Sequence, residues 1–424
     1  MENTEFTPGV RAALVSVVTR DRTEEEAKAS LEELRRLLET AGGEAVFVMM
    51  QNKETPDVRT YLGSGKAAEL CYYCATNEAD LAVFDCELSP SQIRNLEEVL
   101  GENVRVIDRS MLILDIFALH ATSGEGKLQV ELAQLKYSLP RLMGLGTVLS
   151  RLGGGIGTRG PGESQLEVDR RHIRRRISDL DSELKELSRQ RGLRRARREK
   201  TGQDIVALVG YTNAGKSTLL NALSGANVLA EDKLFATLDP VMRKIDLPEN
   251  RDCLLVDTVG FIRKLPHQLV EAFKSTLEET LCADLILIVS DASSDQCAEQ
   301  RAVVLDVLRQ LGASGKPMLE VLNKCDSIPE KLMPTADALP ISARTGEGLE
   351  ELREAISKRI SSLRHRVRMV IPYSQGNILS LIHERGQIVS EDYGAEGTEI
   401  ICMLDGALYQ KVQKMMRGGV IELA

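Results

Sequence analysis

The sequence predicts an α/β protein of several domains, and three patterns along its 424 residues support this prediction. Apolar strands alternate with amphipathic helices over residues 11–108, and two long leucine-rich helical patterns follow. Near-continuous apolar strands then alternate with helices from 204 to 359, as in a mostly parallel sheet that is covered on both faces. We therefore predict an N-terminal α/β domain (1–120), an antiparallel helical hairpin (121–200), an α/β domain with a mostly parallel sheet (201–362) and a small C-terminal α+β domain (363–424).

The N-terminal domain is predicted from its strands and from one strongly periodic helix. RAALVSVV and AVFVMM have the composition of strands, and between them Ala27, Leu31, Leu34 and Leu38 recur at helical spacing. LAVFDCEL and VRVID follow as further strands around a helix that begins at SPSQ. The segment Gly63-Ser64-Gly65-Lys66 imitates a phosphate loop, but Thr60 and Ala67 stand where that loop needs Gly and Ser or Thr. We predict no nucleotide site there.

The hairpin is predicted from two apolar stripes that each need a partner to leave water. The first stripe consists of Leu128, Leu132, Leu135, Leu139 and Leu142. The second stripe, with heptad-like steps, consists of Leu166, Ile173, Ile177, Leu180, Leu184 and Leu187. Packing the two helices side by side places the glycine-rich segment between them, RLGGGIGTRGPG, at the tip of the hairpin.

The glycine-rich segment contains Gly155-Ile156-Gly157-Thr158-Arg159-Gly160, which matches G-x-G-x-x-G. A dinucleotide cradle would need a strand before this segment, whereas a helical stripe precedes it. Two readings remain, a flexible linker and a loop that contacts another molecule. Charge favours contact, because residues 170–200 hold 13 Lys or Arg and 5 Asp or Glu, a net of +8 in a chain of net charge −9. Such a segment indicates a local polyanion contact, and charge alone fits a solvated helix face equally well.

The composition otherwise indicates a cytoplasmic protein. No apolar run is long enough to span a bilayer, and the start, MENTEFTPGV, lacks the pattern of a signal peptide. We expect no stable membrane anchor, no DNA partner and reduced cysteines. Cys71 and Cys74 form a C-x-x-C without a second pair at zinc spacing, so we interpret them as buried helix residues. The last 60 residues have the pattern strand, helix, strand, strand, helix, and contain no motif that indicates a chemical function.

A phosphate loop is predicted at residues 210–217, where GYTNAGKS matches G-x-x-x-x-G-K-S between the apolar strand IVALV and the helical STLLNALSG. Backbone N–H groups of such a loop surround phosphate oxygens, and the following helix adds its dipole. Lys216 would meet the β- and γ-phosphates, and the Ser217 hydroxyl would bind Mg²⁺.

Three further motifs follow in the order expected of a guanine-nucleotide site. Asp257, in DTVG, ends an apolar strand and could hold Mg²⁺ through water, while Gly260 would offer its N–H to a γ-phosphate. Asp326, in NKCD, could accept two hydrogen bonds from guanine that adenine cannot donate. The loop SAR could close over the base, and Thr237, in FATLDP, could supply a second Mg²⁺ ligand. The expected nucleotide contacts are Gly210, Tyr211, Thr212, Asn213, Ala214, Gly215, Lys216, Ser217, Phe235, Ala236, Thr237, Leu238, Asp239, Asp257, Thr258, Val259, Gly260, Asn323, Lys324, Cys325, Asp326, Ser342, Ala343 and Arg344.

These motifs resemble those of the translation-factor-class P-loop GTPases, and the wider chain resembles the HflX family of ribosome-associated GTPases. YLGSGKAAEL, RLGGGIGTRGPGESQLEVDRR, GYTNAGKST and FATLDP carry the second resemblance. It implies a Mg²⁺-dependent enzyme that binds GTP and GDP, with Lys216, Thr237 and Gly260 in the catalytic machinery. It also implies a partner, the large (50S) ribosomal subunit and its rRNA, and a role in splitting or rescuing stalled ribosomes. On this basis we expect a monomer whose hairpin tip contacts rRNA through Arg151, Gly154, Gly155, Gly157 and Arg159.

Phe261 stands where many small GTPases have a glutamine that orients the attacking water. Phenylalanine cannot do so, and the sequence shows no clear arginine finger within the chain. We therefore expect slow intrinsic hydrolysis that ribosomes stimulate. Two other functions remain possible on sequence alone. One is a ribosome-assembly GTPase that acts on immature large subunits, and the other is a signalling or membrane-associated GTPase, which the C-terminus GGVIELA does not favour.

Overall fold

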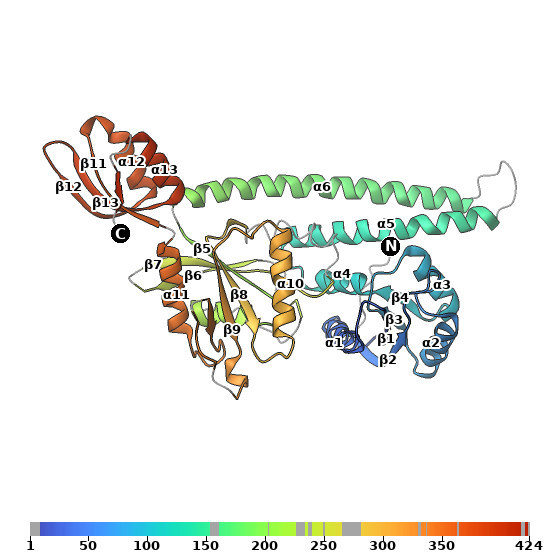
Figure 1. Ribbon diagram of the computed structural model, residues 1–424. Helices are drawn as coiled ribbons and strands as arrows, with labels where there is room; N and C mark the ends of the chain where they lie inside the picture. Colours follow the sequence, from blue (N-terminus) through green and yellow to red (C-terminus); the bar gives the residue numbers. More distant parts are fainter. Residues whose placement is uncertain are drawn as a thin grey trace.

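A computed structural model describes residues 9–152, 161–201, 203–225, 234–235, 240–248, 251–264, 281–329, 332–335, 337–362, 364–416 and 420–422. It confirms the multidomain α/β architecture, with three sheets in sequence and a long helical hairpin beside the first two (Figure 1). Within these ranges, every helix is too short or too polar to traverse a lipid bilayer.

The N-terminal part is a four-stranded parallel sheet of order β2-β1-β3-β4 between two helical layers. The apolar residues of α1 and α4 pack on one face of the sheet, and those of α2 and α3 pack on the other. Thr23 caps α1 and forms a capping box with Glu26, as the polar residues before the leucine stripe favour. The elements are β1 (Arg11–Val18), α1 (Glu24–Thr40), β2 (Glu44–Asn52), α2 (Ser64–Thr76), β3 (Leu81–Phe84), α3 (Pro90–Leu100), β4 (Arg105–Asp108) and α4 (Arg109–His120).

The imitation phosphate loop is the start of α2. Gly63 is the N-cap residue, and its N–H donates to the Gln51 side chain at 2.9 Å. Lys66 forms an ion pair with Glu69 of the same helix at 2.8 Å, so its charge is used locally. Further along α2, Cys74 is buried while Cys71 is half-buried. Among the described residues, no group of three His, Cys, Asp or Glu is placed to hold a metal ion.

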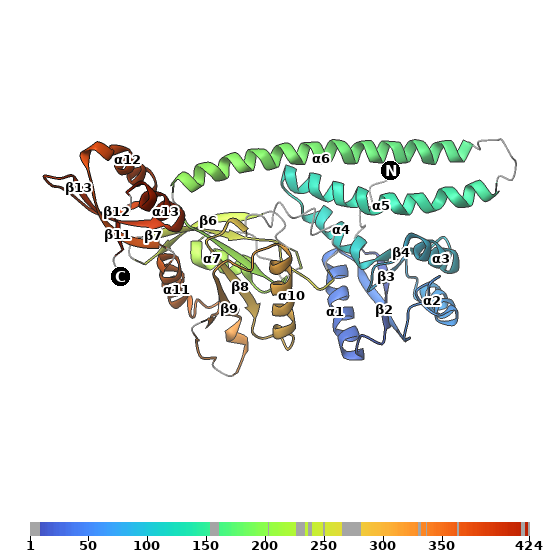
Figure 2. The same ribbon diagram turned by 45° about the horizontal axis from the view of Figure 1, so that its top comes forward.

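The hairpin consists of α5 (Gly124–Leu152) and α6 (Pro161–Thr201), which run side by side in opposite directions (Figures 1 and 2). Ion pairs join the two helices, Lys136 with Asp181 at 3.2 Å and Arg191 with Glu125 at 2.8 Å. Among the side chains of α6 that the structure describes, Ile173 and Leu180 are the most buried apolar ones, and both belong to the predicted stripe.

A second face of α5, which the leucine stripe does not reveal, packs against the N-terminal domain. Val130, Ala133 and Tyr137 are buried in the same hydrophobic cluster as α1 and α4. The Arg141 guanidinium lies 3.5 Å from the centre of the Tyr137 ring and forms an ion pair with Asp108 at 3.0 Å. The hairpin is therefore fixed to the N-terminal domain along α5.

The nucleotide domain, our term for residues 201–362, contains a six-stranded sheet of order β10-β9-β8-β5-β7-β6. All neighbouring strands are parallel except β6 and β7, which form an antiparallel edge pair. Fully buried strands such as β5 explain the near-continuous apolar runs of the sequence. The elements are β5 (Ile205–Gly210), α7 (Lys216–Ser224), β6 (Val241–Leu247), β7 (Arg251–Asp257), β8 (Leu285–Asp291), α10 (Cys297–Gln310), β9 (Met318–Asn323), η1 (Cys325–Ser327), β10 (Ala338–Pro340) and α11 (Leu349–Ser362).

The C-terminal domain has β-α-β-β-α-β order and an antiparallel sheet of order β12-β13-β11-β14, the ferredoxin-like arrangement. The last strand, β14, was not predicted, because its three residues are too few for a periodic pattern. The α12 helix contacts α6, so this domain lies against the end of the hairpin that leads to β5. The elements are β11 (Arg364–Ile371), η2 (Tyr373–Gln375), α12 (Gly376–Arg385), β12 (Gln387–Tyr393), β13 (Thr398–Asp405), α13 (Gly406–Met415) and β14 (Val420–Glu422).

One hydrophobic cluster joins the N-terminal domain to the nucleotide domain. It extends from α1, α4 and α5 to Tyr211, Phe235 and Val259, all of which belong to the motifs singled out above. The rings of Phe117 in α4 and Phe235 meet edge to face with centroids 4.6 Å apart. The nucleotide-binding edge of the second sheet is thus packed directly against the first domain.

Candidate nucleotide site

The phosphate loop connects β5 to α7, and two of its glycines are required by their surroundings. A Cβ on Gly210 would lie 2.2 Å from the carbonyl oxygen of Val289 in β8. Gly215 has φ +89°, and a Cβ there would lie 2.2 Å from the Asn323 side chain. Glycine at both positions lets the loop pass close to the neighbouring strands and turn its N–H groups inward.

Lys216 is buried at the start of α7 with its ammonium group inside the loop. Nζ donates hydrogen bonds to the carbonyl oxygens of Gly210, at 3.2 Å, and of Tyr211, at 2.8 Å. Burial lowers the pKa of Lys216 to about 8, although the nearby carboxylate of Asp257 partly opposes this. The loop therefore holds a cation whose charge a bound phosphate would stabilise.

Two residues around this ammonium group suit the terminal phosphate. The Thr212 hydroxyl oxygen is buried and has no hydrogen-bond partner among the described residues. Gly260 lies so close that a Cβ would be 2.8 Å from Thr212 and 3.0 Å from Nζ of Lys216. A buried, unsatisfied hydroxyl and a glycine pressed against the loop indicate a cradle for an anion.

Ser217 and Asp257 lie beside each other below the phosphate loop. The Ser217 hydroxyl donates to Asp257 Oδ2 at 2.6 Å, and the Asp257 side chain is fully buried at the end of β7. A hydroxyl next to a carboxylate is the all-oxygen donor set that Mg²⁺ prefers. The neighbouring Thr258 is used structurally, since its hydroxyl donates to the Leu208 carbonyl at 2.6 Å.

Asn323 connects the phosphate loop to the loop that contains SAR. Its side-chain amide donates to the Ala214 carbonyl at 2.9 Å, and its amide oxygen accepts from the N–H of Ala343 at 3.0 Å. Lys324 has a left-handed backbone with φ +66°, and its ammonium group pairs with Asp291 at 2.7 Å. The first two residues of NKCD therefore hold the site together.

The Asp326 carboxylate is held at the opposite end of the site by the SAR loop. The Ser342 hydroxyl donates to Oδ1 at 2.6 Å, and Arg344 pairs with Oδ2. The Ser342 hydrogen bond, with a smaller contribution from Arg344, holds the pKa of Asp326 below its ordinary value. Asp326 is thus an ionised hydrogen-bond acceptor near neutral pH, as guanine recognition requires. Cys325, between these residues, donates its thiol to the Leu322 carbonyl.

Phe261 lies in the hydrophobic core behind the site and is 2% exposed. Only its backbone reaches the phosphate loop, where its N–H donates to Gly210 at 3.0 Å and its carbonyl accepts from Thr212 at 2.8 Å. Its side chain therefore takes no part in orienting water, and its backbone instead keeps DTVG against the phosphate loop.

Some predicted contact residues direct their side chains toward the N-terminal domain. The Tyr211 hydroxyl bonds to Glu33 of α1 and accepts the N–H of Arg263 at 2.8 Å. The Phe235 ring packs on Phe117, and Val259 belongs to the same cluster. Sequence reasoning missed this interdomain function, since nothing in the local motif indicates a partner 178 positions away.

Several predicted residues lie outside the described part of the chain. These are Ala236, Thr237, Leu238 and Asp239 near the expected Mg²⁺ site, and Gly154, Gly155, Gly157 and Arg159 of the glycine-rich segment. Arg151 lies in α5, but its side chain is also outside the described part. The expectations for these residues stay predictions.

Three protein families match consecutive parts of the chain. Residues 28–118 match a family described as GTP-binding GTPase N-terminal, and residues 120–198 match GTP-binding GTPase Middle Region. Residues 205–324, which contain the phosphate loop and NKCD, match 50S ribosome-binding GTPase. The three matches follow the N-terminal domain, the hairpin and the nucleotide domain in order.

Two relatives that align with most of the chain are both named GTPase HflX. GTPase HflX of Caldanaerobacter subterraneus subsp. tengcongensis is 50% identical over 392 residues, covering 92% of this chain and 90% of the relative. GTPase HflX of Escherichia coli (strain K12) is 42% identical over 402 residues, covering 93% of each. A solved GTP-binding protein of Sulfolobus solfataricus in complex with GDP is 30% identical, covers 84% of this chain and 99% of its own, and superposes with a TM-score of 0.44.

Proposed function

Since the chain belongs to the HflX family of GTPases, and so binds GTP and hydrolyses it to GDP and phosphate, we propose that it works on the large (50S) ribosomal subunit. The proposed role is to split or rescue stalled ribosomes, as a cytoplasmic monomer. The description of the family that matches residues 205–324, 50S ribosome-binding GTPase, supports the partner.

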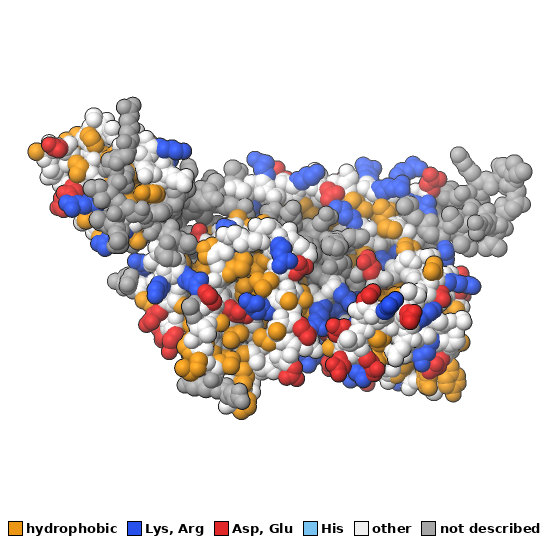
Figure 3. All heavy atoms as spheres, viewed as in Figure 1, with side chains coloured by type: hydrophobic (Ala, Val, Ile, Leu, Met, Phe, Trp, Pro, Cys, Tyr) orange, Lys and Arg blue, Asp and Glu red, His pale blue; other side chains and the backbone are white. Residues whose placement is uncertain are grey.

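The observation that carries this proposal is the basic surface of α6. Figure 3 shows Lys and Arg side chains gathered along the edge that this helix forms. The exposed members include Arg171, Arg174, Arg175, Lys185 and Arg189. On a chain of net charge −9, this helix offers a positive surface to a polyanion. Structured RNA is recognised largely through its shape and phosphates, which suits a rigid basic helix. The glycine-rich segment, with Arg151 and Arg159 (Arg151 at the end of α5), would add contacts at the tip.

In the proposed mechanism, the nucleotide is bound by charge and by base recognition. Lys216 and the inward N–H groups of the phosphate loop hold the β- and γ-phosphates. Ser217 and Asp257 would hold Mg²⁺, with Asp257 acting through water and Thr237 as a second protein ligand. When bound there, Mg²⁺ would neutralise part of the phosphate charge. Asp326 accepts hydrogen bonds from guanine, and Gly260 offers its N–H to the γ-phosphate.

Ribosomes are expected to accelerate hydrolysis, because the Phe261 side chain is buried in the core and cannot orient water. The test is to mix the protein with 70S ribosomes and either GTP or GDP, and to follow subunit separation by light scattering. We expect splitting with GTP and none with GDP. Sedimentation with mature and precursor 50S particles then tests the target. Binding to precursor particles alone would indicate a function in ribosome assembly and not in splitting.

A further inference from the structure

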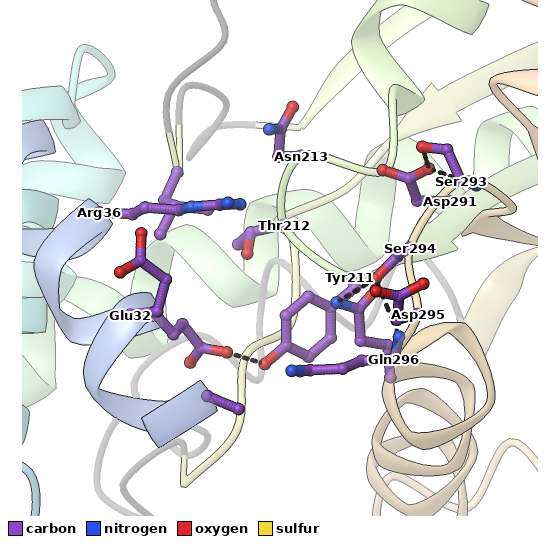
Figure 4. Close-up of a pocket in the computed structure, with 14 residues that line it drawn as sticks. Glu32, Arg36, Tyr211, Thr212, Asn213, Asp291, Ser293, Ser294, Asp295 and Gln296 are labelled. Carbon is purple, nitrogen blue, oxygen red and sulfur yellow. Dashed lines mark hydrogen bonds between the residues drawn. The ribbon is translucent and has the colours of Figure 1, made fainter. Parts of the chain in front are cut away.

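A cavity of about 430 Å³ lies between the N-terminal domain and the phosphate loop (Figure 4). One wall is α1, a second is the phosphate loop at Tyr211–Asn213, and a third is the segment from Asp291 to Gln300, where α10 begins. Leu234 contributes to the lining from the stretch before Thr237. Side chains of the first domain therefore line the same cavity as the phosphate loop.

Two features of the cavity suit an anion. The buried Thr212 hydroxyl is without a hydrogen-bond partner in the described chain and lines the cavity. Arg36 is the one basic side chain among the described lining residues, and Figure 4 shows it extending from α1 toward Thr212 and Asn213. Because these two residues belong to the loop that cradles phosphates, the anion that fits is the terminal phosphate of GTP.

The other cations at this edge are already engaged. Arg109 and Lys264 pair with Asp85, Arg263 pairs with Glu299, and Lys324 pairs with Asp291. By contrast, the hydrogen bonds and ion pairs formed within the described ranges leave the Arg36 guanidinium without a partner. Beside Lys216, Arg36 is therefore a cation of the described chain at this edge whose charge remains for a ligand.

Four carboxylates line the cavity and bring negative charge near the phosphate loop: Glu32, Glu33, Asp291 and Asp295. Glu33 is neutralised by Arg109, and Asp291 by Lys324. Glu32 lies on α1 one turn before Arg36, with its carboxylate 3.8 Å from Arg35. Negative charge beside the phosphate loop repels a triphosphate, and a guanidinium placed between them offsets that repulsion.

We propose that Arg36 contacts the γ-phosphate and stabilises the transition state of GTP hydrolysis. The water oxygen forms a bond to the γ-phosphorus while the bond to the β–γ bridging oxygen breaks, and GDP leaves with the electron pair. The protons of the water pass to the phosphate product and to solvent. Negative charge develops on the bridging and γ-oxygens, and a planar guanidinium can donate two hydrogen bonds to it. The first domain thus supplies in cis a group that other GTPases receive from a partner.

The test compares Arg36→Ala and Arg36→Lys with a control, Lys28→Ala. Lys28 is an exposed cation of the same helix that pairs with Glu24 at 2.7 Å and does not line the cavity. Single-turnover hydrolysis is measured without ribosomes, so that the result does not depend on the ribosomal role. Affinities for GDP and for GDP with aluminium fluoride, which imitates the transferring phosphoryl group, are measured with Mg²⁺.

We expect Arg36→Ala to slow hydrolysis by about 10²-fold or more, since an arginine in this position contributes about 10³ to 10⁵ in other GTPases. It should weaken binding of the aluminium fluoride complex while leaving GDP affinity within about two-fold. Arg36→Lys should lie between, because lysine restores the charge without the planar fork. Lys28→Ala should match the wild type. An unchanged hydrolysis rate, or an equal loss of GDP and GDP–aluminium fluoride affinity, would overturn the assignment.

Discussion

Lys264 joins the segment that follows DTVG to the N-terminal domain through Asp85. Its ammonium group donates to the Asp85 carbonyl oxygen at 2.9 Å and lies 3.4 Å from Oδ2 of the same residue. The Asp85 carboxylate is buried and also pairs with Arg109 and with Arg22, each at 2.9 Å. Burial alone would raise the pKa of Asp85, but Arg109, Lys264 and Arg22 hold it below its ordinary value. One ionised carboxylate therefore connects both domains.

Asp85→Asn should destabilise the protein by about 3 kcal/mol, because Arg109, Arg22 and Lys264 lose a fully buried carboxylate partner. The loss in the free energy of unfolding is measured from the midpoint of urea unfolding. The control is Glu78→Gln, which removes an exposed partner of Arg11 and should cost less than about 1 kcal/mol. Since the pKa of Asp85 is lowered by folding, its stabilisation is complete above about pH 4 and is lost as the pH falls further. Equal effects of the two substitutions would contradict this account.

Gly260→Ala should reduce both GTP affinity and hydrolysis by about ten-fold or more. The added Cβ would lie 2.8 Å from Thr212 and 3.0 Å from the Lys216 ammonium group, so the phosphate loop or DTVG must move. Gly65→Ala is the matched control, because a Cβ at that position in α2 meets nothing within 4 Å. Fluorescent-nucleotide binding and single-turnover assays give both quantities. Normal binding by the Gly260 variant would mean that the loops adapt freely.

GTP affinity should fall as the pH rises above about 8. Burial lowers the pKa of Lys216 to about 8, so the free protein loses this charge at a pH where ordinary lysines keep theirs. The phosphates attract the ammonium form, so binding above pH 8 requires uptake of a proton. The effect of pH on folding has the opposite sign. Between about pH 8 and 10, Lys216 holds its proton in the unfolded chain but not in the folded chain. The free energy of unfolding therefore increases as the pH rises through this range.

The measurement is GTP titration between about pH 7 and 8.5, on either side of the pKa of Lys216. Lys216→Ala should abolish GTP binding throughout, since the phosphates lose their main side-chain partner. A flat pH profile for the wild type would show that the ammonium group keeps its proton in the free protein. Wild-type affinity of the alanine variant would remove Lys216 from the phosphate site.

Asp326→Asn should weaken GTP binding and favour XTP. The carboxylate accepts from the ring N–H and the exocyclic amine of guanine, whereas xanthine carries an oxygen where guanine has the amine, and an amide can donate to it. The side chain at position 326 should keep its place, because the Ser342 hydroxyl can still donate to the amide oxygen. A competition assay with GTP and XTP reads the preference. An unchanged preference for GTP would argue against base recognition by Asp326.

Charge reversal in the glycine-rich segment should impair ribosome splitting and spare the nucleotide site. Arg151→Glu with Arg159→Glu replaces phosphate attraction by repulsion, and the weakened binding should be most visible at higher salt. Replacing Gly154, Gly155 and Gly157 by alanine should also impair splitting, because it blocks close backbone approach. Arg309→Glu, an exposed position of α10, is the charge control. GTP affinity is measured, and ribosome splitting is followed by light scattering, on the same preparations. Splitting that survives both sets of changes would show that the segment is only a linker.

Local motifs and periodicity were enough to predict the domain types and the nucleotide-binding edge. GYTNAGKS between an apolar strand and a helix indicated the loop around Lys216, and the leucine stripes indicated the hairpin. Both patterns work because the interacting groups are neighbours in the sequence or share one helix face.

The contacts between the domains could not be predicted in this way. Phe117 with Phe235, and Asp85 with Lys264, bring together residues that are more than 100 positions apart, and each looks like an ordinary core or surface residue in its own segment. Arg36 is one of several charged residues on an amphipathic helix. Only the packing of α1 against the phosphate loop distinguishes it from Arg35.

The length of α6 has a mechanical consequence. Its 41 residues rise about 1.5 Å each, so the helix is a rod of about 60 Å. It ends four residues before β5, the strand that carries the phosphate loop, and α12 of the C-terminal domain contacts it. A tilt of only about 10° at that end displaces the far end by about 10 Å over such a length. Because α5 fixes the hairpin to the N-terminal domain, a tilt of α6 would carry that domain with it.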